Sequence, residues 1–202
     1  MDMTRMPPAS ALLPEEEEDR LPVLCEVASG LGPHGASLFI GNKVAADDPA
    51  LLLTEGVTST MNLAVNVEMA PLTLSDGTTI RRTHIGLIDG PGNAPQHLLA
   101  GVMALHGMLT QDSPGKPHYP PHRRGHVLVH CRGGRSRSAT VIALYLHLAL
   151  PERFPDFDSA VNHVRQVRGL GDNQPQPAML TLARDALTHL STGLRIFAPA
   201  KF

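Results

Sequence analysis

Apolar residues occur in short runs separated by turn-forming residues along the first half of the chain. We expect strands at residues 21–30, 37–42, 57–65 and 79–89, because each run is rich in Val, Ile, Leu or Thr and ends near Gly, Asn or Asp. The triplet Ser75-Asp76-Gly77 predicts a turn just before the fourth strand. A fifth short strand is expected at residues 126–130, whose sequence is HVLVH.

Helical periodicity dominates the second half. Apolar residues recur at steps of three and four between Pro95 and Thr110, the period of an amphipathic helix. Further helices are expected at residues 47–55, 138–150, 156–168 and 174–190, the second of these almost entirely apolar. Strands that alternate with helices predict an α/β fold with a central, mostly parallel sheet flanked by helices.

The domain boundaries follow from composition. Residues 1–20 combine Met, Pro and Ser with an acidic run at 15–19, which predicts a disordered, solvated tail, with docking on a basic surface as the alternative. We expect one catalytic domain over residues 21–190, interrupted by a Pro-rich insertion at 111–125, and a C-terminal tail at 191–202. Neither a secretion signal nor an apolar run long enough for a transmembrane helix is evident.

Charge is balanced overall but not locally. A formal net charge of -2 gives no general attraction to nucleic acid, so we expect no nucleic-acid partner. Between Ser113 and Pro151, however, there is no Asp or Glu, while six basic residues fall there: Lys116, Arg123, Arg124, Arg132, Arg135 and Arg137. This local excess indicates an anionic ligand. Two cysteines, Cys25 and Cys131, are typical of a reducing compartment, which predicts a cytoplasmic protein.

The segment HVLVHCRGGRSRSAT places Cys131 at the end of the fifth strand, six residues before Arg137. A tight turn between a strand and a helix directs backbone N–H groups inward, and the helix N-terminus adds positive potential, which together form a phosphate cradle. Gly133 and Gly134 permit the turn, and Arg137 can bind two phosphate oxygens at once. The expected phosphate-binding set is Arg132, Gly133, Gly134, Arg135, Ser136 and Arg137.

The same surroundings favour a reactive thiolate. Positive dipoles and cations lower the pKa of a cysteine, so we expect Cys131 to be the nucleophile. Ser138 is placed to offer its hydroxyl to the sulfur, whereas His130 is expected to order the loop by hydrogen bonds and not to act as a base. The alternative is that Cys131 is a buried small residue and the arginines only solvate a turn.

The residues HCRGGRSRS resemble the His-Cys-x5-Arg-Ser/Thr signature of protein tyrosine phosphatases, in the form found in the dual-specificity phosphatase family. The segments SLFIGNKVAA, TSTMNLA, SATVIALYL and AVNHVRQVRGLGDNQPQ are also similar to that family, in the same order. The resemblance implies the family's compact fold, a cysteinyl-phosphate intermediate and no metal or other cofactor. It also implies a general acid, normally an Asp upstream of the cysteine.

Asp89 is the expected acid, because it ends a strand and precedes the turn GPGN and a helix. Asp112 is the alternative, although it lies within the Pro-rich insertion. Asp89 could also serve only as a helix N-cap. Histidines 118, 122, 126 and 130 recur every four residues, but they do not share a helical face, so no metal site is expected. Cys25 could pair with Cys131 on oxidation, or remain a buried thiol.

Three functions remain open. The first is a phosphatase acting on phosphotyrosine and phosphoserine or phosphothreonine in proteins. Arg132 and Arg135 favour an alternative, an anionic phospholipid substrate such as a phosphoinositide or phosphatidylglycerophosphate, although they could also bind a second phosphate on a protein. The third is a catalytically inactive module that binds phosphorylated proteins, against which the presence of Cys131, Arg137 and Asp89 argues.

Overall fold

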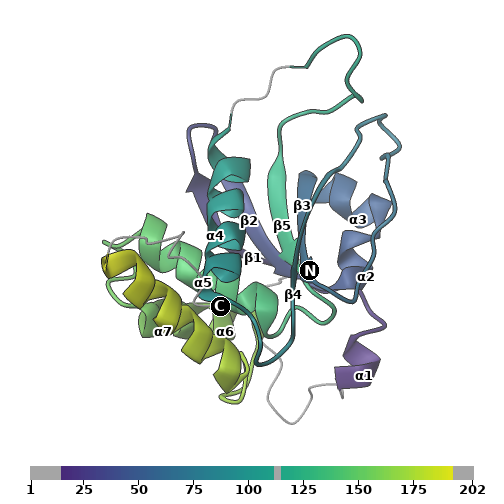
Figure 1. Cartoon of the computed structure of the whole chain (residues 1–202). Helices are drawn as coiled ribbons and strands as arrows, with labels where there is room; N and C mark the ends of the chain where they lie inside the picture. The colour runs from purple at the N-terminus through teal and green to yellow at the C-terminus, as the bar shows by residue number, and fades with distance from the viewer. Residues whose placement is uncertain (1–14, 112–114, 193–202) are drawn as a thin grey trace, which may run out of the picture.

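A five-stranded sheet forms the centre of the molecule in a computed structural model, which describes residues 15–111 and 115–192 (Figure 1). The strands are β1 (Leu24–Leu31), β2 (Ala36–Gly41), β3 (Val57–Ala64), β4 (Arg81–Leu87) and β5 (His126–His130). The helices are α1 (Glu15–Glu18), α2 (Lys43–Ala46), α3 (Pro49–Thr54), α4 (Pro95–Thr110), α5 (Arg137–Ala149), α6 (Phe157–Arg168) and α7 (Pro177–Ser191). The expected α/β class, with a mostly parallel sheet flanked by helices, is confirmed.

The sheet has the strand order β1-β2-β5-β3-β4. β1 pairs with β2 in antiparallel orientation, and every other neighbouring pair is parallel. The most central strand is therefore β5, whose last residue His130 pairs with Gly41 of β2 on one side and Asn62 of β3 on the other. Cys131 follows directly, at the carboxyl edge of the sheet, where sites of parallel α/β proteins commonly lie.

Helices cover both faces of the sheet (Figure 1). α4, α5, α6 and α7 pack against one another on one face, whereas α2 and α3 lie on the other. α5 is almost fully buried, which explains its nearly continuous apolar sequence. The larger core joins α5 to its neighbouring helices and to the sheet, and a smaller core around Phe39, Leu52 and Leu128 fills the opposite face.

Helix starts follow the local sequence. Asp48 caps α3 by accepting hydrogen bonds from the backbone N–H groups of Ala50 and Leu51, both at 3.0 Å. Asp156 caps α6 in the same way through Ser159, at 2.7 Å. Both aspartates stand at the positions where the sequence predicts a helix to begin. The helix α2, only four residues long, had no distinct sequence signal.

Two segments were expected to contain neither helix nor strand, and only one of them does so in the described residues. Residues 115–125 contain neither helix nor strand, as expected of a Pro-rich insertion. Residues 15–18, in contrast, form α1, and the carboxylates of Glu18 and Asp19 pair with arginines of the domain. The prediction of a solvated tail is therefore wrong at Glu15, Glu18 and Asp19, because arginines supply partners for these carboxylates, in line with the alternative of docking on a basic surface. Residues 1–14 and 193–202 lie outside the described part.

Candidate active site

The segment 131–136 joins β5 to α5 as a tight loop at the carboxyl edge of the sheet. Its glycine at position 134 has φ +70°, a left-handed conformation that disfavours other residues, and a Cβ there would clash with the Gly41 carbonyl. The Arg132 carbonyl accepts a hydrogen bond from the Lys43 backbone N–H at 3.0 Å, and the Gly133 carbonyl accepts one from Arg168 at 3.1 Å. With these carbonyls held by neighbouring elements, the loop can present its N–H groups to an anion.

Cys131 is buried at the base of this loop. Burial by itself would raise the pKa of the thiol, but the Arg137 charge and hydrogen bonds from the Ser138 hydroxyl and from the backbone of Ser138 and Gly134 outweigh it, so that the pKa lies below its ordinary value. The Ser138 Oγ lies 3.4 Å from the Cys131 Sγ. A cysteine with a lowered pKa beside an anion-binding loop is suited to nucleophilic chemistry.

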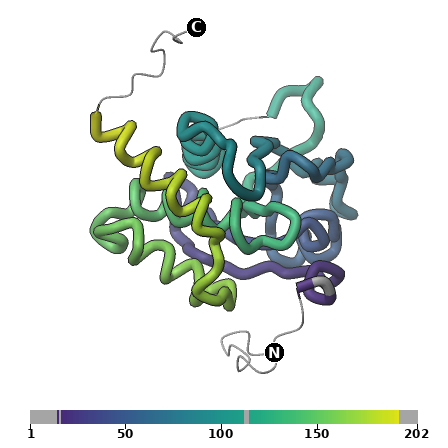
Figure 2. The backbone as a smooth tube through the Cα atoms, turned by 60° about the horizontal axis from the view of Figure 1, so that its bottom comes forward, coloured from purple at the N-terminus to yellow at the C-terminus, as the bar shows by residue number. Residues whose placement is uncertain are grey.

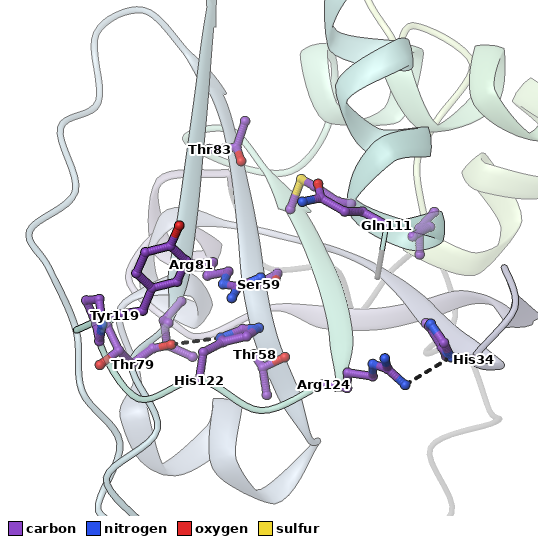
Figure 3. A pocket seen from close by; sticks show the side chains of 16 residues that line it. His34, Thr58, Ser59, Thr79, Arg81, Thr83, Gln111, Tyr119, His122 and Arg124 are labelled. Carbon is purple, nitrogen blue, oxygen red and sulfur yellow. Dashed lines mark hydrogen bonds between the residues drawn. The ribbon is translucent and has the colours of Figure 1, made fainter. Parts of the chain in front are cut away.

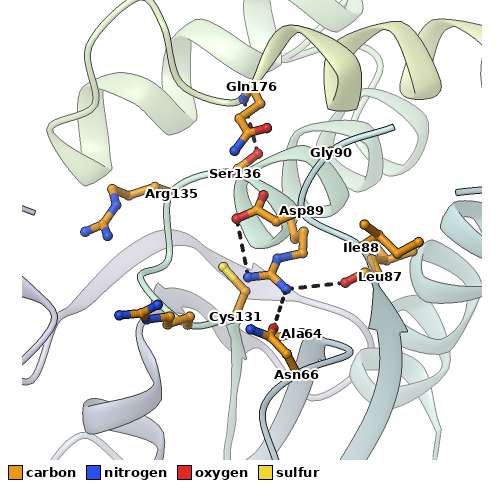
Figure 4. Close-up of polar contacts among 12 residues, drawn as sticks. Ala64, Asn66, Leu87, Ile88, Asp89, Gly90, Cys131, Arg135, Ser136 and Gln176 are labelled. Carbon is orange, nitrogen blue, oxygen red and sulfur yellow. Dashed lines mark hydrogen bonds and ion pairs between the residues drawn. The ribbon is translucent and has the colours of Figure 1, made fainter. Parts of the chain in front are cut away.

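Arg137 is the first residue of α5, and its side chain is only 3% exposed. One terminal nitrogen donates to Asn66 Oδ1 at 3.1 Å and to the Leu87 carbonyl at 3.3 Å, and the other lies 3.4 Å from Asp89 Oδ2 (Figure 4). The Nε is buried and has no hydrogen-bond partner among the described residues. A buried guanidinium with an unused donor suits a bound oxyanion.

Asp89 lies two residues beyond the end of β4, and its side chain is 41% exposed. Figure 4 shows the Asp89 carboxylate facing the loop that carries Cys131. Asp89 does not cap α4, since the residue before that helix is Ala94. The rival Asp112 lies outside the described residues.

A hollow of about 290 Å³ opens over the loop. Its lining combines thiol, carboxylate, guanidinium and amide groups: Glu15, Asp19, Asp89, Cys131, Arg132, Gly133, Arg135, Ser136, Gln174 and Gln176. The Ser136 hydroxyl accepts a hydrogen bond from the Gln176 backbone N–H at 3.1 Å, which ties the loop to the start of α7. Viewed from this end, α1 and α7 lie on either side of the segment that joins β5 to α5 (Figure 2).

His130 is fully buried, and its Nδ1 lies 3.2 Å from the carbonyl of Cys131. Burial lowers the pKa of this imidazole to about 4, and the nearby Arg82 and His84 charges act in the same direction. His130 is therefore neutral near pH 7. A neutral ring in contact with the loop backbone agrees with a loop-ordering role better than with a general base.

The side chains of Arg132 and Arg135 are engaged by α1 and the turn after it. Arg135 lies 2.6 Å from Glu18 and 2.6 Å from Asp19, and Arg132 lies 3.4 Å from Asp19. The Arg135 side chain points away from Cys131 (Figure 4). In this arrangement Arg135 can contribute its backbone N–H to the cradle, but its guanidinium does not reach into it.

Sequence reasoning missed three contributors to the site. Asn66 orients Arg137, Arg168 holds the Gly133 carbonyl, and Gln176 binds the Ser136 hydroxyl. Each comes from a segment far from position 131 in the chain, so that no local spacing connects them. The similarity of the segment AVNHVRQVRGLGDNQPQ to the phosphatase family was the available signal for Arg168 and Gln176, because both residues lie within it.

Cys25 and Cys131 are both free thiols. Cys25 pairs with Ile40 of β2, which pairs with Val129 of β5, so Cys25 and the end of β5 are separated by one intervening strand. Two strand spacings amount to roughly 10 Å, beyond the Cα separation of about 7 Å that a disulfide tolerates. Burial raises the pKa of Cys25 and makes it the less reactive thiol.

Three of the four histidines that recur every four residues contact backbone groups of different segments. His122 Nδ1 lies 3.1 Å from the Thr79 carbonyl, His126 accepts from the Ser37 N–H at 3.0 Å, and His130 contacts Cys131. Within the described residues, no group of three His, Cys, Asp or Glu side chains is arranged to hold a metal ion.

A larger hollow, of about 540 Å³, lies at the opposite end of the sheet (Figure 3). It is bounded by the first residues of β3 and β4, by the end of α4 and by the Pro-rich segment, with Ser59, Arg81 and Tyr119 among its lining. The residues around it include neither cysteine nor carboxylate. The larger hollow is therefore not the candidate active site, because Cys131 and the loop around it line the smaller one.

The chain matches the family model described as "PTP-SAK: Swiss Army Knife protein, DSP-PTPase phosphatase domain" over residues 42–174. This match covers more than half of the sequence and contains the loop, Asp89 and α5. The chain belongs to this family of dual-specificity-type phosphatase domains, which confirms the resemblance to a family of phosphoric monoester hydrolases.

Individual relatives agree with this assignment. The mouse (Mus musculus) dual specificity protein phosphatase 18 is 30% identical over 118 residues, which are 58% of this chain and 54% of the relative. The chain thus spans about half the length of that relative. The crystal structure of human DUSP28 superimposes with a TM-score of 0.59 at 22% identity, covering 85% of this chain and 97% of that one. PTPMT1 in complex with PI(5)P gives 0.53 at 16%, covering 84% and 97%.

Proposed function

We propose that the protein is a cysteine-dependent phosphatase that hydrolyses phosphotyrosine and phosphoserine or phosphothreonine in proteins. The observation that carries this proposal is the Cys131 thiol, whose pKa is lowered despite its burial by the neighbouring Arg137 charge, and which shares one hollow with the Asp89 carboxylate that lies 3.4 Å from Arg137. Membership in the phosphatase-domain family supports the same reaction.

The reaction proceeds in two displacements. The Cys131 thiolate attacks phosphorus, the bond from phosphorus to the leaving oxygen breaks, and Asp89 gives that oxygen a proton. Arg137 and the loop N–H groups bind the phosphoryl oxygens as charge develops. Water then attacks the cysteinyl-phosphate, Asp89 accepts its proton, and the sulfur leaves as a thiolate that the Ser138 hydroxyl stabilises. No metal or other cofactor takes part in this scheme.

Two properties of the molecule favour a protein substrate over a lipid one. Asp89 is 41% exposed at the hollow, so that its carboxylate is accessible to a phosphopeptide, and the Arg132 and Arg135 charges are compensated by carboxylates of the segment 15–19. Within the described residues, no helix has the length and apolar character required to cross a membrane. Both cysteines are free thiols, which suits the cytoplasm.

The alternative is a phosphoinositide or phosphatidylglycerophosphate substrate. It is favoured by the structural similarity to PTPMT1, which was crystallised with PI(5)P, and by the two additional arginines of the loop. A catalytically inactive phosphoprotein-binding module is the other alternative. The lowered Cys131 pKa weighs against it, because a binding module needs no reactive thiol.

The test is phosphate release from a panel of phosphotyrosine and phosphothreonine peptides, phosphoinositides and phosphatidylglycerophosphate. We expect release from the peptides, loss of release in Cys131→Ser, and full release in the matched variant Cys25→Ser. Equal release by the wild type and Cys131→Ser would overturn the enzyme proposal. Release from lipids alone would instead establish the lipid alternative.

A further inference from the structure

The segment 15–19 brings carboxylates to the rim of the active-site hollow. The Arg135 guanidinium binds Glu18 through one terminal nitrogen and Asp19 through the other, both at 2.6 Å. Asp19 also lies 3.4 Å from the Arg132 Nε. Asp19 is therefore an anion held between two arginines that belong to the phosphate-binding loop.

The Asp19 carboxylate reaches the loop backbone itself. A Cβ added to Gly133 would lie 2.8 Å from Asp19 Oδ1, and Asp19 lines the same hollow as Cys131. Asp19 and Arg135 are each only 14% exposed, whereas Arg132 is 65% exposed. Asp19 and Arg135 thus lie side by side in the lining of the hollow, and a substrate anion that pairs with Arg135 there competes with the Asp19 carboxylate.

Glu18 anchors the segment independently of Asp19. It lies 2.8 Å from Arg168, a side chain that is 5% exposed and that also binds the Gly133 carbonyl. Burial by itself would raise the Glu18 pKa, but Arg168 and Arg135 outweigh it and hold the pKa below its ordinary value. Glu18 therefore holds the end of α1 in place through Arg168, a contact that does not depend on the Asp19 carboxylate.

We propose that Asp19 is a specificity-determining residue that fills an anion site formed by Arg132 and Arg135. It disfavours peptides that carry a second phosphate beside the scissile one, because that phosphate must displace the carboxylate. The arginine pair suits such a phosphate once Asp19 is neutral, since guanidinium groups bind phosphate in two-point geometry. This inference rests on the proposed protein phosphatase function.

The test compares a phosphotyrosine peptide with peptides that also carry phosphothreonine one or two residues away. Asp19→Asn removes the charge and keeps the shape, and Glu17→Gln, in the preceding helix α1, removes the same charge with no ion pair described for Glu17. We expect Asp19→Asn to raise kcat/KM for a doubly phosphorylated peptide at least fivefold relative to the singly phosphorylated one. We expect Glu17→Gln to change neither value more than twofold.

The double variant Asp19→Asn/Arg135→Gln should lose that gain, because Arg135 supplies the site. An unchanged ratio in Asp19→Asn, or an equal loss of activity on both peptides, would overturn the inference and make Asp19 a structural partner of the loop. Should Asp19→Asn melt below the assay temperature, Asp19→Ser takes its place, and the inference requires the same rise in the ratio of kcat/KM for the doubly over the singly phosphorylated peptide. Failure of the wild type to hydrolyse the singly phosphorylated peptide would instead defeat the proposed function.

Discussion

The Cys131 Sγ and the Ser138 Oγ lie 3.4 Å apart, although seven residues separate them in the chain. The loop closes on itself so that the first turn of α5 returns to the residue that follows β5. This contact lowers the Cys131 pKa together with the Arg137 charge, against the opposing effect of burial. The serine is therefore part of the environment that lowers the pKa of the Cys131 thiol.

Ser138→Ala should raise the Cys131 pKa and slow turnover by roughly tenfold, because a hydrogen bond to a charged group contributes on the order of 1.5 kcal/mol. The pH dependence of alkylation by iodoacetamide measures the pKa, in a Cys25→Ser background that leaves one thiol. Ser136→Ala is the control, since the Ser136 hydroxyl binds Gln176. An unchanged alkylation profile in Ser138→Ala would show that Ser138 does not stabilise the thiolate.

Asp89→Asn should lower kcat by roughly 100-fold for phosphopeptides, the usual contribution of a general acid. KM should change little, since the variant retains Arg137 and the loop. The loss should be much smaller for an aryl phosphate with an acidic leaving phenol, which departs without a proton. Asp112→Ala is the comparison and should keep its kcat; the reverse result would assign the acid to Asp112.

Arg137→Lys should raise KM and lower kcat/KM by at least about tenfold. Lysine keeps the positive charge but cannot bind two phosphate oxygens in one plane, and it loses contacts to Asn66 and Leu87. Competition by inorganic phosphate measures binding apart from turnover and should weaken in parallel. Phosphate binding as tight as in the wild type would contradict a phosphate-binding role.

His130 should make the protein less stable between pH 6.5 and about 4. The pKa of His130 is lowered in the folded state, so as the pH falls the unfolded chain takes up a proton at this ring before the folded protein does. The stability contributed by the neutral ring is therefore complete above pH 6.5 and is lost as the pH falls to about 4. The difference between the ordinary pKa of 6.5 and the folded-state pKa of about 4 corresponds to about 3 kcal/mol of unfolding free energy, at roughly 1.4 kcal/mol per pKa unit. Urea unfolding of the wild type and His130→Asn at several pH values measures it. If the free energy of unfolding falls with pH to the same extent in the wild type and in His130→Asn, His130 is not the group that causes the loss of stability.

Most of the fold could be predicted from local pattern. The period of α4 and the aspartates before α3 and α6 marked helices close to their observed bounds. The strand at 126–130 was evident from its apolar run. Local interactions within a few residues define such elements, and they leave a trace in the sequence. The four-residue α2 left no such trace, because its buried cap Asn42 depends on contacts with Leu21 and Val23.

The sequence by itself determined the loop at Cys131, because Cys131, the two glycines, Arg137 and Ser138 lie within eight consecutive residues. Only the tertiary structure decided what surrounds that loop. Asn66 and Arg168 reach it from other segments, and their contacts depend on how strands and helices pack. The tertiary structure likewise turned the acidic run near the N-terminus into the partner of Arg135, since opposite charges far apart in the chain attract only once folding brings them together.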